Sequence, residues 1–230
     1  MLLAQILFTQ GFGTRRICAG IVAQGLVRVG GLVVADPRAD VDTGGLVFEV
    51  DGRAWPYHER ALIMLHKPAG YECSRKPRHH PSVLSLLPPP LRTRGVQPVG
   101  RLDEDTTGLL LLTDDGPLIH RLTSPKWHVP KVYEVGTERP VNDDEVRRLL
   151  AGVVLDDDPA PVRAAACERT GDLAMRLTLV EGKYHQVKRM LAAVGNRVAT
   201  LHRSAIGNLV LPADLPAGAW YWLEADRDWA

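Results

Sequence analysis

Residues 107–113, which read TGLLLLT, constrain the fold more than any other stretch because they place four leucines in succession. A short continuous apolar run between polar residues is typical of a strand that is buried on both faces. Asp115 follows, and then Gly116 and Pro117, an order that predicts the capped start of a helix. We therefore expect a buried strand that leads into a helix, with Asp114 and Asp115 as structural residues of the helix start.

The beginning of the chain predicts a small unit of its own. Two short helical stretches precede the sequence GLVRVGGLVV, whose alternating apolar residues and central glycine pair predict a hairpin. A further strand is expected over residues 44–50, and the polar residues 51–60 have the composition of a domain linker. The sequence thus predicts one domain over residues 1–52 and a larger one over residues 60–230.

The larger domain is expected to combine strands with helices. Residues 61–70 predict a buried strand, and the basic, proline-rich residues 75–95 predict a surface loop. Residues 173–179 alternate between apolar and polar side chains, as a half-buried strand does. In residues 185–196 apolar side chains recur at helical spacing until Gly195, where a helix would end. Strands outnumber helices, which favours the α+β class.

Charge is segregated along the chain, although the formal net charge is only +1. Residues 66–101 contain seven Lys or Arg against one acid, and residues 176–203 contain six against one. Acids gather elsewhere, with eight against four bases in residues 141–172. Two basic segments of this kind are consistent with a nucleic-acid partner. Solvated charged faces without a partner fit equally well.

Other classes of protein find no support in the sequence. Cys18, Cys73 and Cys167 form no CxxC pair, so neither a disulfide framework nor a cysteine zinc site is expected. The opening MLLAQILFTQGFG lacks a basic region and is interrupted by glutamines, so no signal peptide or membrane span is predicted. The adjacent His79 and His80 lack metal-ligand spacing, and no phosphate-binding glycine loop occurs. We expect a cytoplasmic protein without metal or cofactor.

Asp103 lies in the loop before the leucine strand, two residues after Arg101. A carboxylate near a cation stays ionised, as a nucleophile or an electrostatic stabiliser must. On spacing alone an Asx turn is the better interpretation, because turn aspartates are common. Glu104 or Asp105 could supply the second acid of a carboxylate-dependent glycoside hydrolase, but neighbours in a turn seldom face one pocket. We therefore expect Glu104 and Asp105 to be turn residues.

Tyr133 lies in a predicted strand, KVYEV, with Lys131 on the same face. A lone tyrosine on a strand is most often a core or interface residue. The residues alone leave its role open.

Three stretches together resemble the motifs of the RsuA-type pseudouridine synthases, a family that modifies ribosomal RNA. PVGRLDEDTTGLLLLTDDG is similar to the signature around that family's catalytic aspartate, and KVYEV to the motif whose tyrosine contacts the target base. EGKYHQVKRMLAAVGN, followed by VATLHRSAIG, resembles the third motif, and its HQVKRM and LHR are closer to the small-subunit enzymes. The motifs lie between residue 60 and the C-terminus, and the first 50 residues resemble the family's S4 RNA-binding module.

The resemblance implies a fold and a set of site residues. A small S4-like module would precede an α+β synthase domain with a mixed, largely antiparallel sheet flanked by helices. Asp103 would be the nucleophile, Tyr133 would stack on the uracil, and Lys188 would pair with Asp103. Arg101 would help to hold the flipped nucleotide, and Leu201 would pack beneath the site.

The expected RNA contacts are basic residues of both domains. They are Arg15, Arg16, Arg28, Lys67, Arg75, Lys131, Lys183, Arg189 and Arg203.

The implied reaction converts a specific uridine of small-subunit ribosomal RNA to pseudouridine. It breaks an N-glycosidic bond, rotates the base and makes a C–C bond, without a redox cofactor, metal or ATP. The partner would be ribosomal RNA or the assembling small subunit, and the protein is expected to be a monomer away from membranes. Two alternatives stay open, namely a large-subunit enzyme of the same family and an RNA-binding or ribosome-assembly protein without activity.

Overall fold

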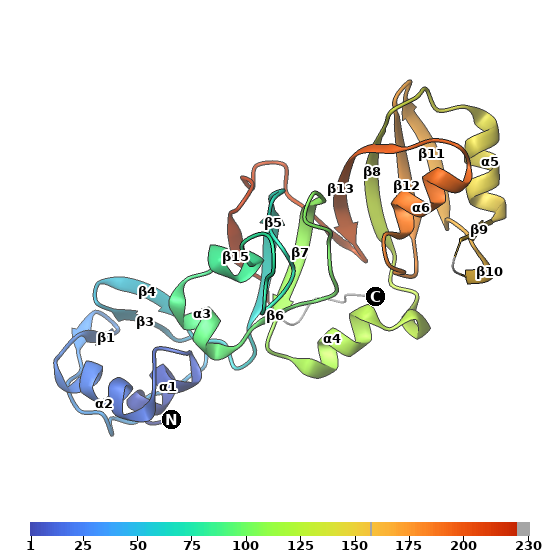
Figure 1. Cartoon of the computed structure of the whole chain (residues 1–230). Coiled ribbons are helices and arrows are strands. Elements are labelled where there is room, and N and C mark those ends of the chain that lie inside the picture. Colours follow the sequence, from blue (N-terminus) through green and yellow to red (C-terminus); the bar gives the residue numbers. More distant parts are fainter. Residues whose placement is uncertain (157, 225–230) are drawn as a thin grey trace. The chain divides into compact units, whose positions relative to one another are not determined.

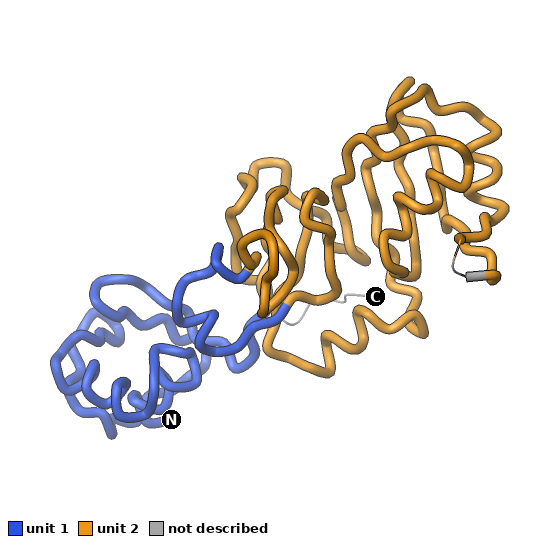
Figure 2. The backbone as a smooth tube through the Cα atoms, viewed as in Figure 1, with its two compact units in different colours: residues 1–61, 84–97 blue, residues 62–83, 98–230 orange. Residues whose placement is uncertain are grey.

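The chain divides into two compact units in the computed structural model, which describes residues 1–156 and 158–224 (Figure 2). Unit 1 comprises residues 1–61 and 84–97, and unit 2 comprises residues 62–83 and 98–230. Figure 1 labels the helices α1 Leu3–Thr9, α2 Arg15–Ala23, α3 Pro89–Arg94, α4 Gly116–Thr123, α5 Asp143–Ala151 and α6 Gln186–Ala193. The described residues also form the short 3-10 helices η1 Val83–Leu86 and η2 Pro125–Trp127.

The strands of the described residues belong to three separate sheets. They are β1 Val27–Val29, β2 Leu32–Val33, β3 Val47–Val50, β4 Arg53–Pro56, β5 Leu62–Lys67, β6 Gln97–Pro98, β7 Thr107–Thr113, β8 Lys131–Thr137, β9 Val153–Leu155, β10 Asp158–Val162, β11 Ala166–Gly171, β12 Ala174–Leu179, β13 Val198–Ile206, β14 Leu209–Val210 and β15 Trp220–Trp222.

Unit 1 is built on an antiparallel sheet with strand order β2-β1-β3-β4. The predicted hairpin joins β1 to β2, and Gly30 and Gly31 turn it with φ values of 56° and 79°. Helices α1 and α2 pack against each other and bury one apolar cluster with the sheet. Its buried members are Leu3, Ile6, Leu7, Cys18, Val22, Val27 and Phe48.

The predicted linker over residues 51–60 is wrong in part, because residues 53–56 form β4 and pair with β3. The two strands are joined at Asp51 and Gly52, which have φ values of 49° and 72°. An Asp-Gly pair with positive φ at both residues is a common hairpin turn. The assignment of an RNA-binding module and a catalytic domain to particular boundaries stays a prediction.

Residues 75–95 also contain more structure than the predicted loop, since η1 and α3 lie within them. Prolines occupy the first turn of α3, where a missing N–H removes no helical hydrogen bond. Gly95 ends the helix in the left-handed region, at φ 86°. Proline therefore starts this short helix rather than preventing it.

Unit 2 is built on a mixed sheet with strand order β11-β12-β8-β13-β7-β5-β15. The pairing of β13 with β7 is parallel, and the other neighbours along this path are antiparallel. Strand β7 carries the four leucines, which have 0% exposure, between β5 and β13. The predicted α+β class, with a largely antiparallel sheet, is confirmed.

Among the described residues, unit 2 contains two apolar clusters that position the elements around the site. One lies where α5 and α6 contribute leucines and Met190 to the face of β8 and β12. The other joins α4 to β5 and β7. The predicted start of α4 is also confirmed, because the Asp115 carboxylate accepts a hydrogen bond from the Leu118 backbone N–H at 3.1 Å.

The helices of the described ranges lack the combination of length and hydropathy that crossing a membrane requires.

Candidate active site

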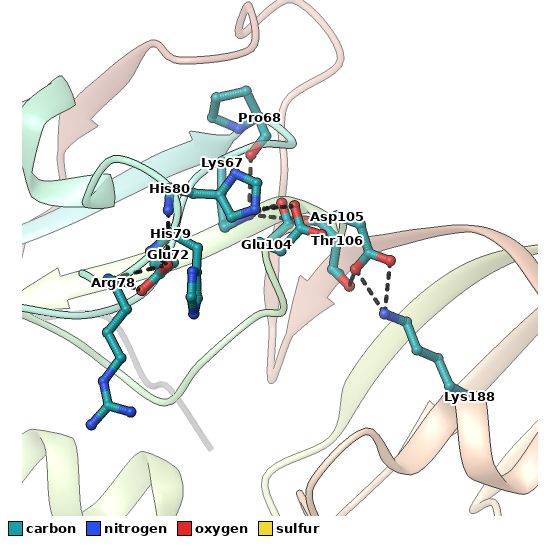
Figure 3. A network of polar contacts seen from close by, with 10 residues as sticks. All are labelled: Lys67, Pro68, Glu72, Arg78, His79, His80, Glu104, Asp105, Thr106 and Lys188. Carbon is teal, nitrogen blue, oxygen red and sulfur yellow. Dashed lines mark hydrogen bonds and ion pairs between the residues drawn. The ribbon is translucent and has the colours of Figure 1, made fainter.

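The loop that holds Asp103 is organised by a buried lysine at the end of β5. Lys67 has 0% exposure, and its ammonium donates hydrogen bonds to the carbonyls of Pro68, Glu104 and Thr106 at 3.1, 3.1 and 2.8 Å (Figure 3). Burial lowers the pKa of Lys67, and the nearby Cys73 and acidic side chains only partly oppose this. The sequence predicts Lys67 on the RNA-binding surface, but the structure makes it an internal support of the Asp103 loop.

Helix α6 brings Lys188 to this loop, as the sequence resemblance implies. Its ammonium lies 3.2 Å from Oδ2 of Asp103. It also donates to both carboxylate oxygens of Asp105, at 2.7 and 2.8 Å (Figure 3). The expectation that Asp105 only shapes the turn is therefore wrong, since Asp103 and Asp105 both face Lys188. In this short loop the side chains of Asp103 and Asp105, which are separated by one residue, both point toward Lys188.

The contact between Lys188 and Asp105 shifts the pKa values of both residues. Partial burial by itself lowers the pKa of Lys188, but the hydrogen bonds to Asp105 and Asp103 outweigh it and raise that pKa. Burial likewise opposes ionisation of Asp105, and the hydrogen bond from Lys188 outweighs it and lowers the pKa of Asp105. The ammonium of Lys188 thus lies between Asp103 and Asp105.

His185 is a second basic partner of Asp103. Its Nε2 atom lies 3.3 Å from Oδ1 of Asp103, whereas Lys188 faces Oδ2. His185 precedes α6 with φ 48°, a left-handed conformation that is uncommon for a residue with a side chain. Such backbone strain persists only where the surroundings support it, and it often marks functional sites. In the sequence His185 lies three residues before Lys188, and no sequence pattern identifies it as a partner of Asp103.

Tyr133 lies in a row of residues that crosses three strands. Its Cα is opposite that of Arg203 on β13, and Arg203 is in turn opposite Gly108 on β7. A Cβ atom on Gly108 would meet the Arg203 carbonyl oxygen at 2.3 Å, and φ is 108°, so only glycine fits. The Tyr133 ring is half-buried and packs against the cluster of β8 and α6. Leu201, with 8% exposure, belongs to the same cluster.

Arg203 is predicted to contact RNA, but it is only 3% exposed. Its Nε atom donates to the Leu109 carbonyl at 2.9 Å, which ties β13 to β7. Lys131 is half-buried, donates to the Val129 carbonyl at 2.9 Å, and has a pKa lowered first by burial and then by the charge of Arg203. Arg203 therefore lies within the sheet rather than on an open RNA-binding surface, whereas the RNA contact of the half-buried Lys131 stays a prediction.

The other predicted contact residues remain accessible. Arg15, Arg16, Arg28, Arg75 and Arg101 are exposed, and Lys183 and Arg189 are half-buried. Within the described part of the chain, Arg101 forms no ion pair with Asp103, so its expected contact with the nucleotide stays a prediction. His79 and His80 are exposed as expected.

The segment that contains these histidines is held by Glu72. Its carboxylate accepts hydrogen bonds from the backbone N–H groups of Arg78, His79 and His80 (Figure 3). These bonds, with those from His79 and His80 first, lower the pKa of Glu72 to about 2. Over residues 1–156 and 158–224, no three His, Cys, Asp or Glu side chains gather closely enough to hold a metal ion.

The site presents one accessible carboxylate between two basic side chains. Asp103 is 28% exposed, so a substrate can reach it, and both its oxygens face basic side chains. Such a carboxylate is suited to nucleophilic attack or to charge stabilisation. Residues 61–193 match the family described as RNA pseudouridylate synthase, and the chain belongs to that family.

Named relatives agree with this assignment. The ribosomal small subunit pseudouridine synthase A of Escherichia coli strain K12 is 47% identical over 163 residues, which cover 71% of this chain and 70% of that protein. The protein of the same name from Vibrio parahaemolyticus is 40% identical over 221 residues, 94% of each chain. A crystal structure of a pseudouridylate synthase is 34% identical, covers 97% of this chain and 96% of its own, and has a TM-score of 0.69.

Proposed function

We propose that this chain converts a uridine of small-subunit ribosomal RNA to pseudouridine, with Asp103 as the nucleophile. The observation that carries the proposal is the Asp103 carboxylate, held at 3.2 Å by Lys188 and at 3.3 Å by His185 in front of β7. The relatives that match over two thirds or more of this chain support the substrate, because two of them are named for the small ribosomal subunit.

The reaction needs a nucleophile and proton transfer but no net change in composition. The bond between uracil N1 and ribose C1′ breaks, the base rotates, and C5 forms a bond with C1′. C5 loses a proton and N1 gains one, so the product is an isomer of the substrate. Lys188 places a positive charge 3.2 Å from the Asp103 carboxylate, which attacks either the ribose or the uracil ring.

The target uridine has to leave the base stack to reach Asp103. Tyr133 offers a ring on which the uracil can stack, and stacking on an aromatic side chain contributes about 1–3 kcal/mol per base. Leu201 belongs to the apolar cluster against which Tyr133 packs and so supports the ring from below the surface. Both residues act as the pocket for the base in this proposal.

The RNA backbone is bound by accessible cations, since phosphate contacts supply most of the affinity for a nucleic acid. Arg15, Arg16 and Arg28 are exposed on unit 1, and Arg75 and Arg101 are exposed on unit 2. Lys183 and Arg189 lie near Lys188 in sequence and complete the set. The partner is ribosomal RNA or the assembling small subunit, which places the reaction in the cytoplasm, and the protein acts as a monomer.

Transcripts of both ribosomal RNAs separate this proposal from its alternatives. The protein is incubated with small-subunit or large-subunit transcript, or with assembling particles, and pseudouridine is mapped by carbodiimide treatment and primer extension. We expect one new stop in small-subunit RNA. A stop only in large-subunit RNA would favour the large-subunit enzyme. Binding without any stop in RNA or particles would favour the RNA-binding protein without activity.

A further inference from the structure

Tyr184 presents an exposed aromatic ring immediately beside the site. Its exposed fraction is 74%, which is unusual for so large a side chain. The ring stacks on that of His185, with centroids 3.8 Å apart and an interplanar angle of 21°. His185 in turn contacts Asp103, so the tyrosine is one side chain removed from the proposed nucleophile.

The segment that carries this ring is held by its own hydrogen bonds. The Gln186 side chain accepts from the Lys183 backbone N–H at 2.8 Å and donates to Glu181 at 2.9 Å. The Tyr184 carbonyl accepts from Arg189 at 3.0 Å. An aromatic ring on a segment held in this way needs little further ordering when a ligand stacks on it.

The charges around Tyr184 favour a nucleic acid over a protein as its ligand. Lys183 and Arg189 both have part of their side chains accessible, and Lys188 lies on the same helix as Arg189. A stacking ring flanked by cations is the arrangement with which proteins bind unpaired bases and their phosphates. The target uracil is assigned to Tyr133, so the ring of Tyr184 is available for a different base.

We propose that Tyr184, stacked on His185, binds an unpaired base adjacent to the target uridine. This inference rests on the proposed function, since it assumes an RNA substrate at Asp103. Stacking of this base on Tyr184 would keep the RNA strand unpaired next to the flipped nucleotide. It would also fix the position of the base relative to His185, which contacts Asp103. Tyr184 is thus a binding residue that helps to select uridines with an unpaired neighbour.

Substitution of Tyr184 tests the stacking. We expect Tyr184→Leu to raise both the Kd for small-subunit transcript and the KM by about 5- to 100-fold, with kcat within about threefold of wild type. Tyr184→Phe keeps the ring and should match wild type. Trp127→Ala removes another exposed aromatic side chain, 57% exposed, and serves as the matched control. Equal Kd and KM for Tyr184→Leu and wild type would overturn the inference.

Abasic substitution of the RNA identifies the base. After the modified uridine has been mapped, abasic nucleotides replace each of its neighbours in turn. We expect one abasic position to weaken binding of wild type and to have little further effect on Tyr184→Leu, because the two changes remove the same contact. Additive effects at every position would contradict the inference. If the wild-type protein makes no pseudouridine, the proposed function is wrong. If it makes pseudouridine but the abasic and Tyr184→Leu effects on binding are additive at every position, only the role of Tyr184 is wrong.

Discussion

Lys188 donates two hydrogen bonds to Asp105, at 2.7 and 2.8 Å, and lies farther from Asp103, at 3.2 Å. The residue that holds the lysine in place is therefore Asp105, and Asp103 shares a cation that is already oriented. A cation that is held mainly by another carboxylate leaves the oxygens of the nucleophile available for reaction. Asp105 is a positioning residue in this account.

We expect Asp105→Asn to lower kcat about tenfold or more and to leave the Kd for RNA nearly unchanged. Loss of the carboxylate removes one of the bonds that raise the pKa of Lys188, so the alkaline limb of the kcat–pH profile should also move to lower pH. Steady-state kinetics over pH measure both effects. Glu104→Gln, a change in the exposed neighbour, is the control and should leave kcat and the alkaline limb of the pH profile as in wild type. Unchanged kcat for Asp105→Asn would contradict this role.

Lys188→Met should lower activity far more than RNA binding, because the ammonium acts on the charge of Asp103. We expect kcat to fall by about a hundredfold or more and the Kd to rise by no more than a few-fold. Single-turnover rates and filter binding provide the two numbers. Equal losses in both would mean that Lys188 is only a phosphate contact.

Lys67→Met should disturb the Asp103 loop from inside the protein. The substitution leaves three carbonyl groups without their buried donor, which should lower the free energy of unfolding by about 2–4 kcal/mol. Denaturant unfolding measures this loss, and kcat should fall while RNA binding by the folded protein persists. Lys76→Met, at an exposed position of the same basic segment, should leave stability within about 0.5 kcal/mol of wild type. Similar stability of the two variants would contradict an internal role for Lys67.

The Glu72 carboxylate should make the conformation of residues 78–80 depend on acid pH. Its pKa is lowered from an ordinary value of 4.5 to about 2, so its bonds stabilise the loop fully above pH 4.5 and are lost as pH falls through about 2. The amide resonances of Arg78, His79 and His80 should therefore shift with a common midpoint near 2. Glu72→Gln should abolish this titration. A midpoint near 4.5 in wild type would contradict the three-amide contact.

Much of the fold could be predicted because its signals are local. Three elements follow from signals that span only a few residues. They are the four leucines of β7, the glycine pair of the first hairpin and the cap of α4. The β3–β4 hairpin differs from the predicted linker because the polar residues around Asp51-Gly52, itself a turn signal, have the composition of a linker. The short helix α3 differs from the predicted loop because prolines at a helix start resemble prolines in a loop.

The site was only partly predictable, because its contacts join distant segments. The pairing of Lys188 with Asp103 came from resemblance, whereas the closer contact with Asp105 needed coordinates. Charge counts could not show that Lys67 and Arg203 are buried, since a strand-end cation and a surface cation look alike in sequence. His185 becomes recognisable only in the structure, where its Nε2 atom lies 3.3 Å from Asp103.

The most direct test of the central claim compares wild type with Asp103→Asn on small-subunit RNA. The asparagine has almost the same shape but lacks the nucleophilic charge, so the variant should fold and bind RNA as wild type does. Carbodiimide mapping should show a pseudouridine stop with wild type and none with Asp103→Asn, even after long incubation at high enzyme concentration. A stop that survives Asp103→Asn would contradict Asp103 as the nucleophile.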